Sequence, residues 1–476
     1  METNKKRVAI IGGGITGLAA AFTLEKAIKN GSQIHYDLYE KTDRLGGKIQ
    51  TEQRDGFIIE RGPDSFLARK KSMSILAKEV GIDHEMLHND TGQAFILKTG
   101  TLHPIPKGAV MGIPTEMKPF IKTDLVSPLG KLRATRDLFL PAFTSSDEDI
   151  SLGHFFRRRL GDEVVDHMIE PLLSGIYAGD LDKLSLRATF PQYQEMEAEH
   201  GSLIKGITRS RKQQPSTGAK PDDQPKKQGM FLSFEKGLES FVDAIERKLN
   251  KKSVHRQADI ININKVDQHF IIEFSNGESK HYDSVIMATP PHVTAKLLSS
   301  YPYFDYLSQI EATSVATVAM AYKEEQVELP YDGTGFVVSK KGDHVITACT
   351  WTHKKWKHTA PEGFALLRAY VGRPNDSAIV HQSDEDIVSA ALNDLKQIIK
   401  IKGQPEFSIV TRWKEAMPQY HVGHSFKIAK IKEDVTKHLH GLYLVGGAYE
   451  GIGLPDCIDQ GQAAANDILR DVTETV

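Results

Sequence analysis

The chain has few cysteines, almost no net charge and no long apolar run, and each of these deficits excludes a class of protein. Its 476 residues include two cysteines, Cys349 and Cys457, which cannot build a disulfide framework or a C-x-x-C site and are typical of a reducing cytoplasm. The sequence contains no run of about 18 apolar residues, so no helix that crosses a bilayer is predicted. Lys and Arg number 60 against 62 Asp and Glu, so a net charge of −2 gives no basis for binding nucleic acid.

The N-terminus imitates a signal peptide, with three basic residues before an apolar stretch. However, Gly12, Gly13 and Gly14 interrupt this stretch where a signal helix would be continuous. A phosphate-binding turn requires glycines at this place. We therefore expect a cytoplasmic protein without a leader, long enough for two or three domains with a sizeable core.

What the chain does have is a dinucleotide-type signature at its start. The stretch RVAIIGGGITG predicts a buried strand over 7–11 and a helix over 16–29. In this G-x-G-x-x-G turn, Gly12 permits the tight bend, Gly14 lets the backbone approach a pyrophosphate, and Gly17 allows close packing of helix on strand. The helix N-terminus adds free N–H groups and the positive end of a dipole for the phosphates.

Glu40 ends the next predicted strand, over 36–40, which completes a β-α-β unit. A carboxylate there can accept both ribose hydroxyls and repels a 2′-phosphate, which disfavours NADP; the alternative is a surface glutamate after a strand. The string Arg44-Leu45-Gly46-Gly47-Lys48 follows. Its glycines permit close backbone approach and its cations can neutralise a pyrophosphate, although an ordinary loop with a basic pair fits the same letters.

A second glycine-rich segment closes the chain. The stretch GLYLVGGAYEGIGLPDCIDQGQAAAN predicts a strand over 441–448 and a helix over 460–469. A chain with such a signature at each end is expected to leave one cofactor domain, build a further part and return to the cofactor. A large flavin needs to be held in this way, so the two ends together indicate flavin redox chemistry.

The middle of the chain mixes helical and strand patterns. Asp55-Gly56 predicts a hairpin, 151–200 is mostly helical, 281–289 predicts one strand, and 311–372 alternates like antiparallel sheet. Residues 205–229 lack hydrophobic periodicity and are rich in Lys, Gln and Pro, so we expect a mobile surface loop there.

The string EK-x-x-RLGGK after a Rossmann unit resembles the FAD-containing amine oxidase superfamily. Four further stretches and the closing YEGIGLPDCIDQG narrow the resemblance to the FAD-dependent protoporphyrinogen and coproporphyrinogen III oxidases of the Gram-positive type. These stretches are ERGPDSFLARKKS, PKGAVMGIP, FFRRRLGDEVVDHMIEPLLSGIYAGDLDKLSLRATFP and RWKEAMPQYHVGH. The resemblance covers nearly the whole chain apart from the expected loop.

The resemblance implies an α/β fold with a Rossmann-like two-motif FAD-binding domain, a mixed-sheet substrate domain and a helical subdomain of the lid or membrane type. The implied division gives the FAD domain 1–95, 230–295 and 408–476, the helical subdomain 96–204, the mobile loop 205–229, and the mixed-sheet domain 296–407.

The resemblance also implies FAD contacts, with Glu40 on the ribose and Trp413 near the isoalloxazine, although Trp413 fits a plain core tryptophan as well. The helix that begins at Gly453 is expected to point its N-terminus at the flavin and stabilise the reduced anion. Monoamine oxidases tether their flavin through a cysteine in the region that matches 414–430, which has none here, so FAD is expected to be non-covalent. The expected contacts are Gly12, Gly13, Gly14, Ile15, Thr16, Gly17, Glu40, Lys41, Arg44, Gly47, Lys48, Gly62, Pro63, Asp64, Ser65, Ile260, Trp413, Ala448, Tyr449, Gly453 and Leu454.

For the substrate, the resemblance implies an apolar macrocycle whose carboxylates need cations. Lys71 is the first candidate and Arg69 the second, against the alternative of a solvated basic helix start. Gly175 and Ile176 are candidates to line the pocket. The basic run 157–159 is expected to be one solvated helix face.

The implied reaction is a six-electron oxidation in three rounds. In each round a hydride passes from a meso carbon to flavin N5, and dioxygen reoxidises the flavin to give hydrogen peroxide. The substrate nitrogens can handle protons, so no catalytic acid or base is nominated, and His421 and His424 are expected to be structural. No spacing predicts a metal site. Contact with a membrane surface, for which no amphipathic helix is apparent, and hand-over of product to a ferrochelatase are hypotheses.

Two other functions remain open on the residues alone. An amine or carotenoid oxidoreductase uses the same scaffold, although only Tyr449 is available in the C-terminal motif for an aromatic cage. A non-catalytic binding protein of this fold would not keep a complete flavin site. The number of substrate propionates, four for coproporphyrinogen or two for protoporphyrinogen, also stays open.

Overall fold

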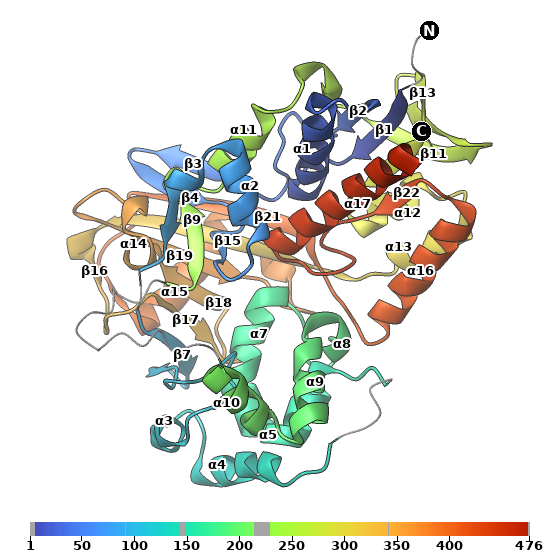
Figure 1. The fold of residues 1–476 in the computed structure, drawn as a ribbon. Coiled ribbons are helices and arrows are strands. Elements are labelled where there is room, and N and C mark those ends of the chain that lie inside the picture. The colour runs from blue at the N-terminus through green and yellow to red at the C-terminus, as the bar shows by residue number, and fades with distance from the viewer. Residues whose placement is uncertain (1–4, 91, 143–147, 214–228, 341, 475–476) are drawn as a thin grey trace.

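The chain builds a parallel sheet covered by helices, a mixed sheet and a helical part, which follow one another from top to bottom in Figure 1. The structure, a computed structural model, describes residues 5–90, 92–142, 148–213, 229–340 and 342–474. The first and the last described segments, residues 5–11 and 454–474, both lie at the parallel sheet (Figure 1). The architecture confirms the expected α/β class.

The first sheet has five parallel strands in the order β10-β2-β1-β14-β22. Their bounds are β1 (Lys6–Ile11), β2 (Ile34–Tyr39), β10 (Val254–His255), β14 (Ser284–Met287) and β22 (Leu442–Leu444). The central strand β1 reads as a continuous apolar run because both faces of the sheet are covered. Val8 and Ile10 pack with the helices of one face, whereas Ala9 and Ile11 pack into the core of the other.

Helices cover one face of this sheet, and an antiparallel meander with further helices covers the other. The first face carries α1 (Ile15–Lys29), α2 (Ser72–Val80), α11 (Glu239–Glu246) and α17 (Leu454–Glu474). The second carries β11 (Ile260–Val266), β12 (His269–Phe274), β13 (Ser279–Tyr282), α12 (Pro291–Leu297), α13 (Asp305–Ser308) and α16 (His424–His438). Both chain ends therefore contribute to the helical face.

The prediction of one continuous strand over 281–289 is wrong. The chain forms two strands there, β13 in the meander and β14 in the parallel sheet, which belong to different sheets. The break lies at Asp283, whose carboxylate accepts the backbone N–H of Arg7 at 2.7 Å. Pairing with different partner strands, β12 for β13 and β1 for β14, decides this break.

The second sheet has seven strands in the order β21-β15-β19-β18-β17-β7-β8, antiparallel except for the pair β17 and β7. The bounds are β7 (Ala94–Lys98), β8 (Thr101–Pro104), β15 (Ala312–Lys323), β17 (Gly335–Val338), β18 (Ile346–Trp351), β19 (Phe364–Val371) and β21 (Phe407–Pro418). Helix α15 (Asp384–Ile398) packs on one face. The predicted hairpin, β3 (Thr51–Arg54) and β4 (Phe57–Glu60), packs on the other through Phe57 and Ile59.

Two segments of this sheet cross the borders of the expected division. Strand β21 lies in the stretch given to the FAD domain, and the hairpin of β7 and β8 lies mostly in the stretch given to the helical subdomain. Pairing between distant strands decides these borders. The three-way division itself stays a prediction.

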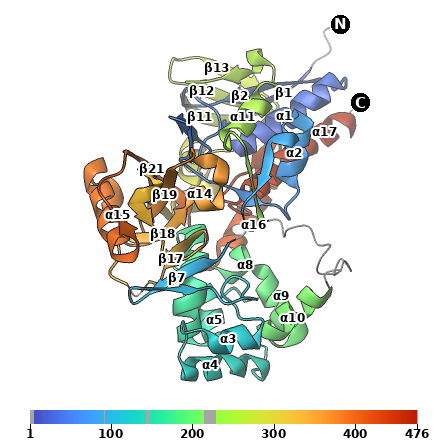
Figure 2. The ribbon, with the colours of Figure 1, turned by 90° about the vertical axis from the view of Figure 1, so that its left-hand side faces the viewer.

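The helical part has a core of its own (Figure 2). It contains α3 (Met117–Lys122), α4 (Pro128–Thr135), α5 (Leu152–Leu160), α6 (Asp162–Val164), a π-helical turn (Val165–Ile169), α7 (Glu170–Tyr177), α8 (Leu186–Thr189), α9 (Pro191–His200) and α10 (Leu203–Gln213). The segments that precede and follow the helical part in sequence pair in a small sheet, which consists of β5 (Phe66–Leu67), β9 (Phe231–Phe234) and β6 (Met86–His88).

Two expectations about this part are corrected. Arg159 is fully buried and binds Glu197 and Asp137, so the basic run 157–159 is not one solvated face. Residues 205–213 continue α10 instead of forming a loop, because Ile204 and Ile207 bury one helix face and Asp137 accepts the N–H of Ile204 at 3.0 Å. The rest of the expected loop, 214–228, lies outside the described residues.

Candidate active site

The N-terminal glycine turn is as tight as the spacing predicts. Gly12 has a φ of +108° and donates its N–H to the carbonyl oxygen of Tyr39 at 2.8 Å, which closes the turn on β2. A Cβ on Gly17 would overlap the carbonyl oxygen of Gly12. Helix α1 can therefore start close to the end of β1 only because residue 17 has no side chain.

The start of α1 is built for an anion. Gly14 precedes the helix without any side-chain cap, and the first turn, which begins Ile15-Thr16, contains no acidic residue. A Cβ on Gly14 would meet nothing within 4 Å, so this side of the turn is open. Uncapped N–H groups and the helix dipole favour negative charge there, which is the condition that a pyrophosphate needs.

Glu40 lies against the same turn. One carboxylate oxygen accepts the N–H of Gly13 at 2.8 Å, and the other accepts the N–H and hydroxyl of Thr42 at 2.9 and 2.8 Å. Ala258, two residues before Ile260 at the start of β11, donates its N–H to the carbonyl of Glu40 at 2.9 Å. Ile260 thus begins its strand beside the ribose position that the resemblance implies.

The loop of Arg44 to Lys48 packs on the glycine turn. Gly46 donates its N–H to the carbonyl of Gly13 at 2.9 Å, and a Cβ on Gly47 would lie 3.2 Å from the Cα of Gly14. The Arg44 guanidinium donates to the carbonyls of Gly47 and Ile49, so in this structure it braces its own loop. Lys41, in contrast, forms a surface ion pair with Asp259 at 3.1 Å.

Lys48 is the cation of this loop that reaches the mixed sheet. Its Nζ donates to the carbonyl oxygen of Ala416 in β21, which links the glycine loop to the mixed sheet. Burial lowers the pKa of the Lys48 amine, and the nearby Cys457 opposes this shift. Because a nearby negative charge favours the charged form of an amine, a negatively charged group bound here would raise the pKa of Lys48 again.

The C-terminal motif closes on the same turn. A Cβ on Gly446 would lie 3.8 Å from the hydroxyl of Thr16, and a Cβ on Gly461 would overlap the backbone of Thr16, so α17 rests directly on α1. Gln460 accepts the N–H of Gly446 at 3.0 Å. Ala448 and Tyr449 are buried, and Gly453 directly precedes α17, which begins at Leu454. The N-terminal and the C-terminal glycine motifs therefore lie side by side at the start of α1.

The segment from Gly62 to Ser65 passes between Lys48 and the mixed sheet. A Cβ on Gly62 would overlap the carbonyl of Lys48, and the indole of Trp413 packs 3.5 Å from that position. Beyond Pro63, the Asp64 carboxylate accepts the Lys355 amine at 2.7 Å and the Ser65 hydroxyl at 2.6 Å. Although burial alone raises it, the Lys355 and Arg368 charges hold the pKa of Asp64 well below its usual range.

The substrate candidates flank the start of α17. Arg69 and Lys71 are both exposed, and within the described part of the chain the Lys71 amine donates to the Ala68 carbonyl at 3.2 Å and to no other group. Between them, Lys70 binds Asp456 in the first turn of α17. On the helical side, Gly175 and Ile176 at the end of α7 are exposed (Ile176 40%), and nothing stands within 4 Å of a Cβ on Gly175.

His424 has the surroundings of a packed core side chain. Its ring stacks on Tyr420 at 4.2 Å between centroids, its Nδ1 lies 3.1 Å from the hydroxyl of Tyr306, and burial lowers its pKa to about 4. The Tyr420 hydroxyl donates to the carbonyl of Gly447 at 2.8 Å. Among the described residues, no group of three or more His, Cys, Asp or Glu side chains could hold a metal ion.

Sequence reasoning missed the residues that brace the motifs from a distance. Gly461 had a visible signal, because a glycine inside a helical pattern marks close packing. Tyr420 lies in a quoted motif without an apparent role. Arg368, which donates to the carbonyl of Gly62, has no local signal.

Comparisons with known proteins agree with this geometry. The family model described as flavin containing amine oxidoreductase matches residues 15–469. The chain is 50% identical to coproporphyrinogen III oxidase of Bacillus subtilis over 98% of this chain and 99% of that protein. It is 43% identical to the protein of the same name from Staphylococcus aureus, over 98% and 100%.

Among solved structures, a candidate protoporphyrinogen oxidase from Exiguobacterium sp. 255-15 superposes with a TM-score of 0.87 at 40% identity, covering 98% of this chain and 99% of that one. Family membership implies a flavin cofactor and an oxidoreductase. The open glycine turn, the uncapped helix and the lysine beside them fit such a group. On the family model and on relatives that align over its whole length, the chain belongs to the flavin-containing amine oxidoreductases.

Proposed function

We propose that this chain is an oxygen-dependent FAD oxidase of haem biosynthesis that converts coproporphyrinogen III to coproporphyrin III, with protoporphyrinogen IX as the other possible substrate. The observation that carries the proposal is the 50% identity over 98% of the chain to a coproporphyrinogen III oxidase, joined to two glycine motifs that meet at one turn. The substrate preference rests on the names of the relatives.

The cofactor we propose is FAD, held without a covalent bond. Its pyrophosphate would lie at the open side of Gly14, its ribose at Glu40, and its flavin end near Gly62, Trp413 and the start of α17. Both described cysteines are buried and free. Bound there, FAD supplies a hydride acceptor that returns its electrons to dioxygen as hydrogen peroxide.

The chain's own residues would bind, orient and shield the substrate. Lys71 and Arg69 are the exposed cations nearest the segment 62–65 in sequence, and we assign them to the substrate carboxylates. Gly175 and Ile176 offer an open backbone and an exposed apolar side chain on the facing helix. No side chain is assigned as a catalytic acid or base.

Turnover with two substrates tests this function. The purified protein is given coproporphyrinogen III or protoporphyrinogen IX, and porphyrin fluorescence and peroxide are followed together. We expect three peroxides per porphyrin and a higher kcat/KM for coproporphyrinogen. Oxidation of simple amines or of a carotene without porphyrin formation would instead favour the hypothesis of an amine or carotenoid oxidoreductase. A colourless protein that does not take up added FAD would favour a non-catalytic binder.

A membrane surface is the second partner we propose, through the end of the helical part. Ile121, Leu129, Leu132 and Phe139 are 59%, 79%, 66% and 86% exposed there, on or next to the adjacent helices α3 and α4 (Figures 1 and 2). Exposed cations beside them suit an anionic lipid surface: Lys118, Lys122 and Arg136. No helix of the described residues meets the length and apolarity needed to cross a membrane.

Vesicle sedimentation tests this contact. Vesicles of phosphatidylcholine and phosphatidylglycerol in equal amounts should carry the protein down, and the Leu129→Asp, Leu132→Asp variant should stay in the supernatant. Equal sedimentation of both would remove the proposal. A cytoplasmic location and hand-over of product to a ferrochelatase are further proposals, and a pull-down without enrichment of a ferrochelatase would remove the second.

A further inference from the structure

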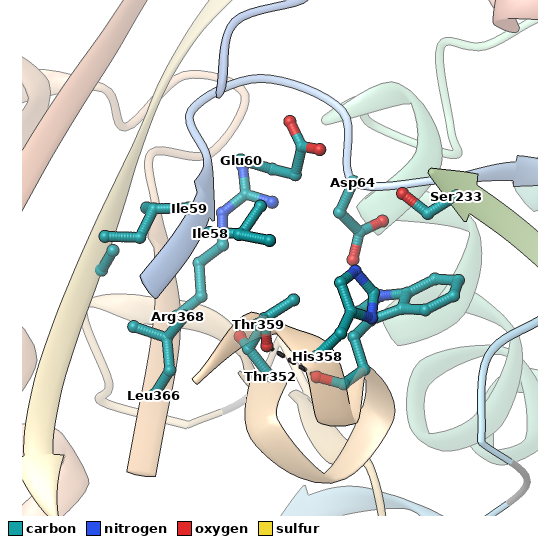
Figure 3. Close-up of a pocket in the computed structure, with 12 residues that line it drawn as sticks. Ile58, Ile59, Glu60, Asp64, Ser233, Thr352, His358, Thr359, Leu366 and Arg368 are labelled. Atoms are coloured by element: carbon teal, nitrogen blue, oxygen red, sulfur yellow. Dashed lines mark hydrogen bonds between the residues drawn. The ribbon is translucent and has the colours of Figure 1, made fainter. Parts of the chain in front are cut away.

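A small cavity lies between the segment that follows β4 and the mixed sheet. Its volume is about 20 Å³, and its polar walls come from widely separated parts of the chain (Figure 3). Glu60 and Asp64 form one side of it, and Arg368 of β19 reaches up from the sheet toward them (Figure 3). The remaining polar wall comes from Ser233 of β9 and from α14 (Thr352–Lys355) with the residues after it, including Trp356.

Three polar atoms in these walls have no hydrogen-bond partner among the described residues. They are the Nε of Arg368, the Nε1 of Trp356 and the Oγ1 of Thr352, and all three are fully buried. An indole N–H and a guanidinium N–H can only donate, so they cannot satisfy each other. Buried polar groups are almost always paired in folded proteins, which indicates that something else fills this cavity.

A single water molecule fits the cavity by size and by charge. One water needs about 10–15 Å³ of such space and two to four polar partners. A water here would accept from the donors Arg368 and Trp356 and donate to Thr352 or to a carboxylate of the wall. The Asp64 and Glu60 carboxyls disfavour an anion, and the Arg368 guanidinium disfavours a cation.

The other contacts of Arg368 connect this cavity to the expected flavin site. Arg368 is 4% exposed, and its Nη2 donates to the carbonyl oxygen of Gly62. The preceding carbonyl, of Arg61, accepts the indole N–H of Trp413 at 2.8 Å. Two consecutive carbonyls are thus held by donors from two strands of the mixed sheet, β19 and β21. On the opposite side, the backbone of Lys48 leaves no room for a Cβ on Gly62.

We propose that Arg368 is a positioning residue for the flavin: backed by one internal water, it fixes the carbonyl of Gly62 and so holds segment 62–65 in its flavin-lining place. The inference rests on the proposed function in so far as that function assigns this segment to the flavin. Asp64, kept anionic by Lys355 and Arg368, balances the buried guanidinium. The carboxylate that balances Arg368 therefore belongs to segment 62–65, which Arg368 positions.

The test uses the full chain, with Arg368→Met as the variant and Arg412→Met as the matched control. Arg412 is an arginine of the same sheet that donates to the carbonyls of Val380 and Gln382, away from the cavity. We expect Arg368→Met to raise the Kd for FAD at least tenfold and to speed amide hydrogen exchange of 62–66 in the FAD-free protein. Arg412→Met should change neither. Wild-type FAD affinity and exchange in Arg368→Met would overturn the proposal.

A milder variant guards against misfolding of Arg368→Met. The pair Thr352→Val, Trp356→Phe leaves Arg368 in place but removes two partners of the water, so we expect a Kd for FAD at least threefold higher and faster exchange of 62–66. Unchanged values would contradict the proposal. A crystal structure of the FAD-bound protein should show one water between Arg368 and Trp356, and an empty cavity would contradict this part. None of these readouts needs porphyrinogen turnover, so failure of the proposed function is seen separately.

Discussion

At the scale of single residues, the carboxylate of Glu40 has the most specific surroundings in the site. It already accepts the amide of Gly13, which orients it at the glycine turn before any ligand arrives. A preorganised carboxylate loses little conformational freedom when a hydroxyl donates to it. Its contribution should therefore appear in cofactor affinity more than in folding.

We expect Glu40→Ala to raise the Kd for FAD by roughly 10- to 150-fold, because hydrogen bonds to a charged group contribute about 1.5–3 kcal/mol. Equilibrium dialysis of the FAD-free protein measures this change. Glu79→Ala is the control, since Glu79 forms an exposed pair with Lys26. Full flavin occupancy in Glu40→Ala at limiting FAD would count against the ribose role.

Lys71 is expected to act on the substrate. Its amine is exposed and has one weak backbone partner, so it is available to a carboxylate. If Lys71 binds the substrate carboxylate equally tightly in the ground state and in the transition state, Lys71→Ala should raise KM with little change in kcat. The loss of one partly exposed charge contact, about 1 kcal/mol, predicts a rise in KM of about five- to tenfold. Steady-state kinetics with coproporphyrinogen III checks this. Lys78→Ala, at the other end of α2, is the control, and wild-type kinetics in Lys71→Ala would assign Lys71 to the solvated surface.

At the scale of elements, the contact between α1 and α17 joins the two ends of the chain. These helices pack closely because Gly461 brings the backbone of α17 onto the carbonyl of Thr16. The N-termini of both helices are thereby set at the same glycine turn. Any side chain at 461 must push the helices apart.

Gly461→Ala should therefore destabilise the protein by about 1–3 kcal/mol, the usual cost of overpacking, despite the better helix propensity of alanine. Thermal unfolding of the FAD-free protein should show a lower apparent Tm, and FAD affinity should fall with it. Asn466→Ala, at an exposed position of the same helix, should leave both unchanged. A Tm equal to that of the wild type would mean that the helices separate without cost.

At the scale of the whole molecule, the helical part and the mixed sheet meet at a buried acid. Glu170 begins α7, which packs against β17 and β18, and it is 7% exposed. Burial raises the pKa of Glu170 to about 7, although Lys340 and Arg373 oppose the shift. In the unfolded chain the carboxyl has its ordinary pKa, near 4.3.

The sign of the pH effect follows from this difference. Below the unfolded pKa both states are protonated, and the full stability is present. Between that value and about 7 the unfolded chain ionises while the folded protein keeps its proton, so stability falls as pH rises, by at most about 4 kcal/mol. Glu170→Gln should equal the wild type near pH 4.5 and exceed it at pH 8 in urea unfolding. Glu195→Gln, on an exposed position, is the control, and parallel pH profiles for Glu170→Gln and the wild type would contradict this account.

The glycine motifs show how much the linear pattern reveals. The turn from Gly12 to Gly17 and the acid at Glu40 were predictable because a strand, a turn and a helix close in sequence impose their own geometry. Residues with remote partners were not. Arg44, a candidate to neutralise the pyrophosphate, donates to loop carbonyls, and Lys48 reaches Ala416, far along the chain.

The sequence by itself determined the α/β class, the two glycine turns and, by resemblance, the flavin family, because backbone geometry at a glycine and the period of buried side chains are local properties. Tertiary structure alone decided that α17 rests on α1, that β21 leaves the expected cofactor domain for the mixed sheet, and that Arg368 holds Gly62. These contacts join residues hundreds of positions apart. Burial and hydrogen bonding select such partners only in the assembled core, where no pattern along the chain records them.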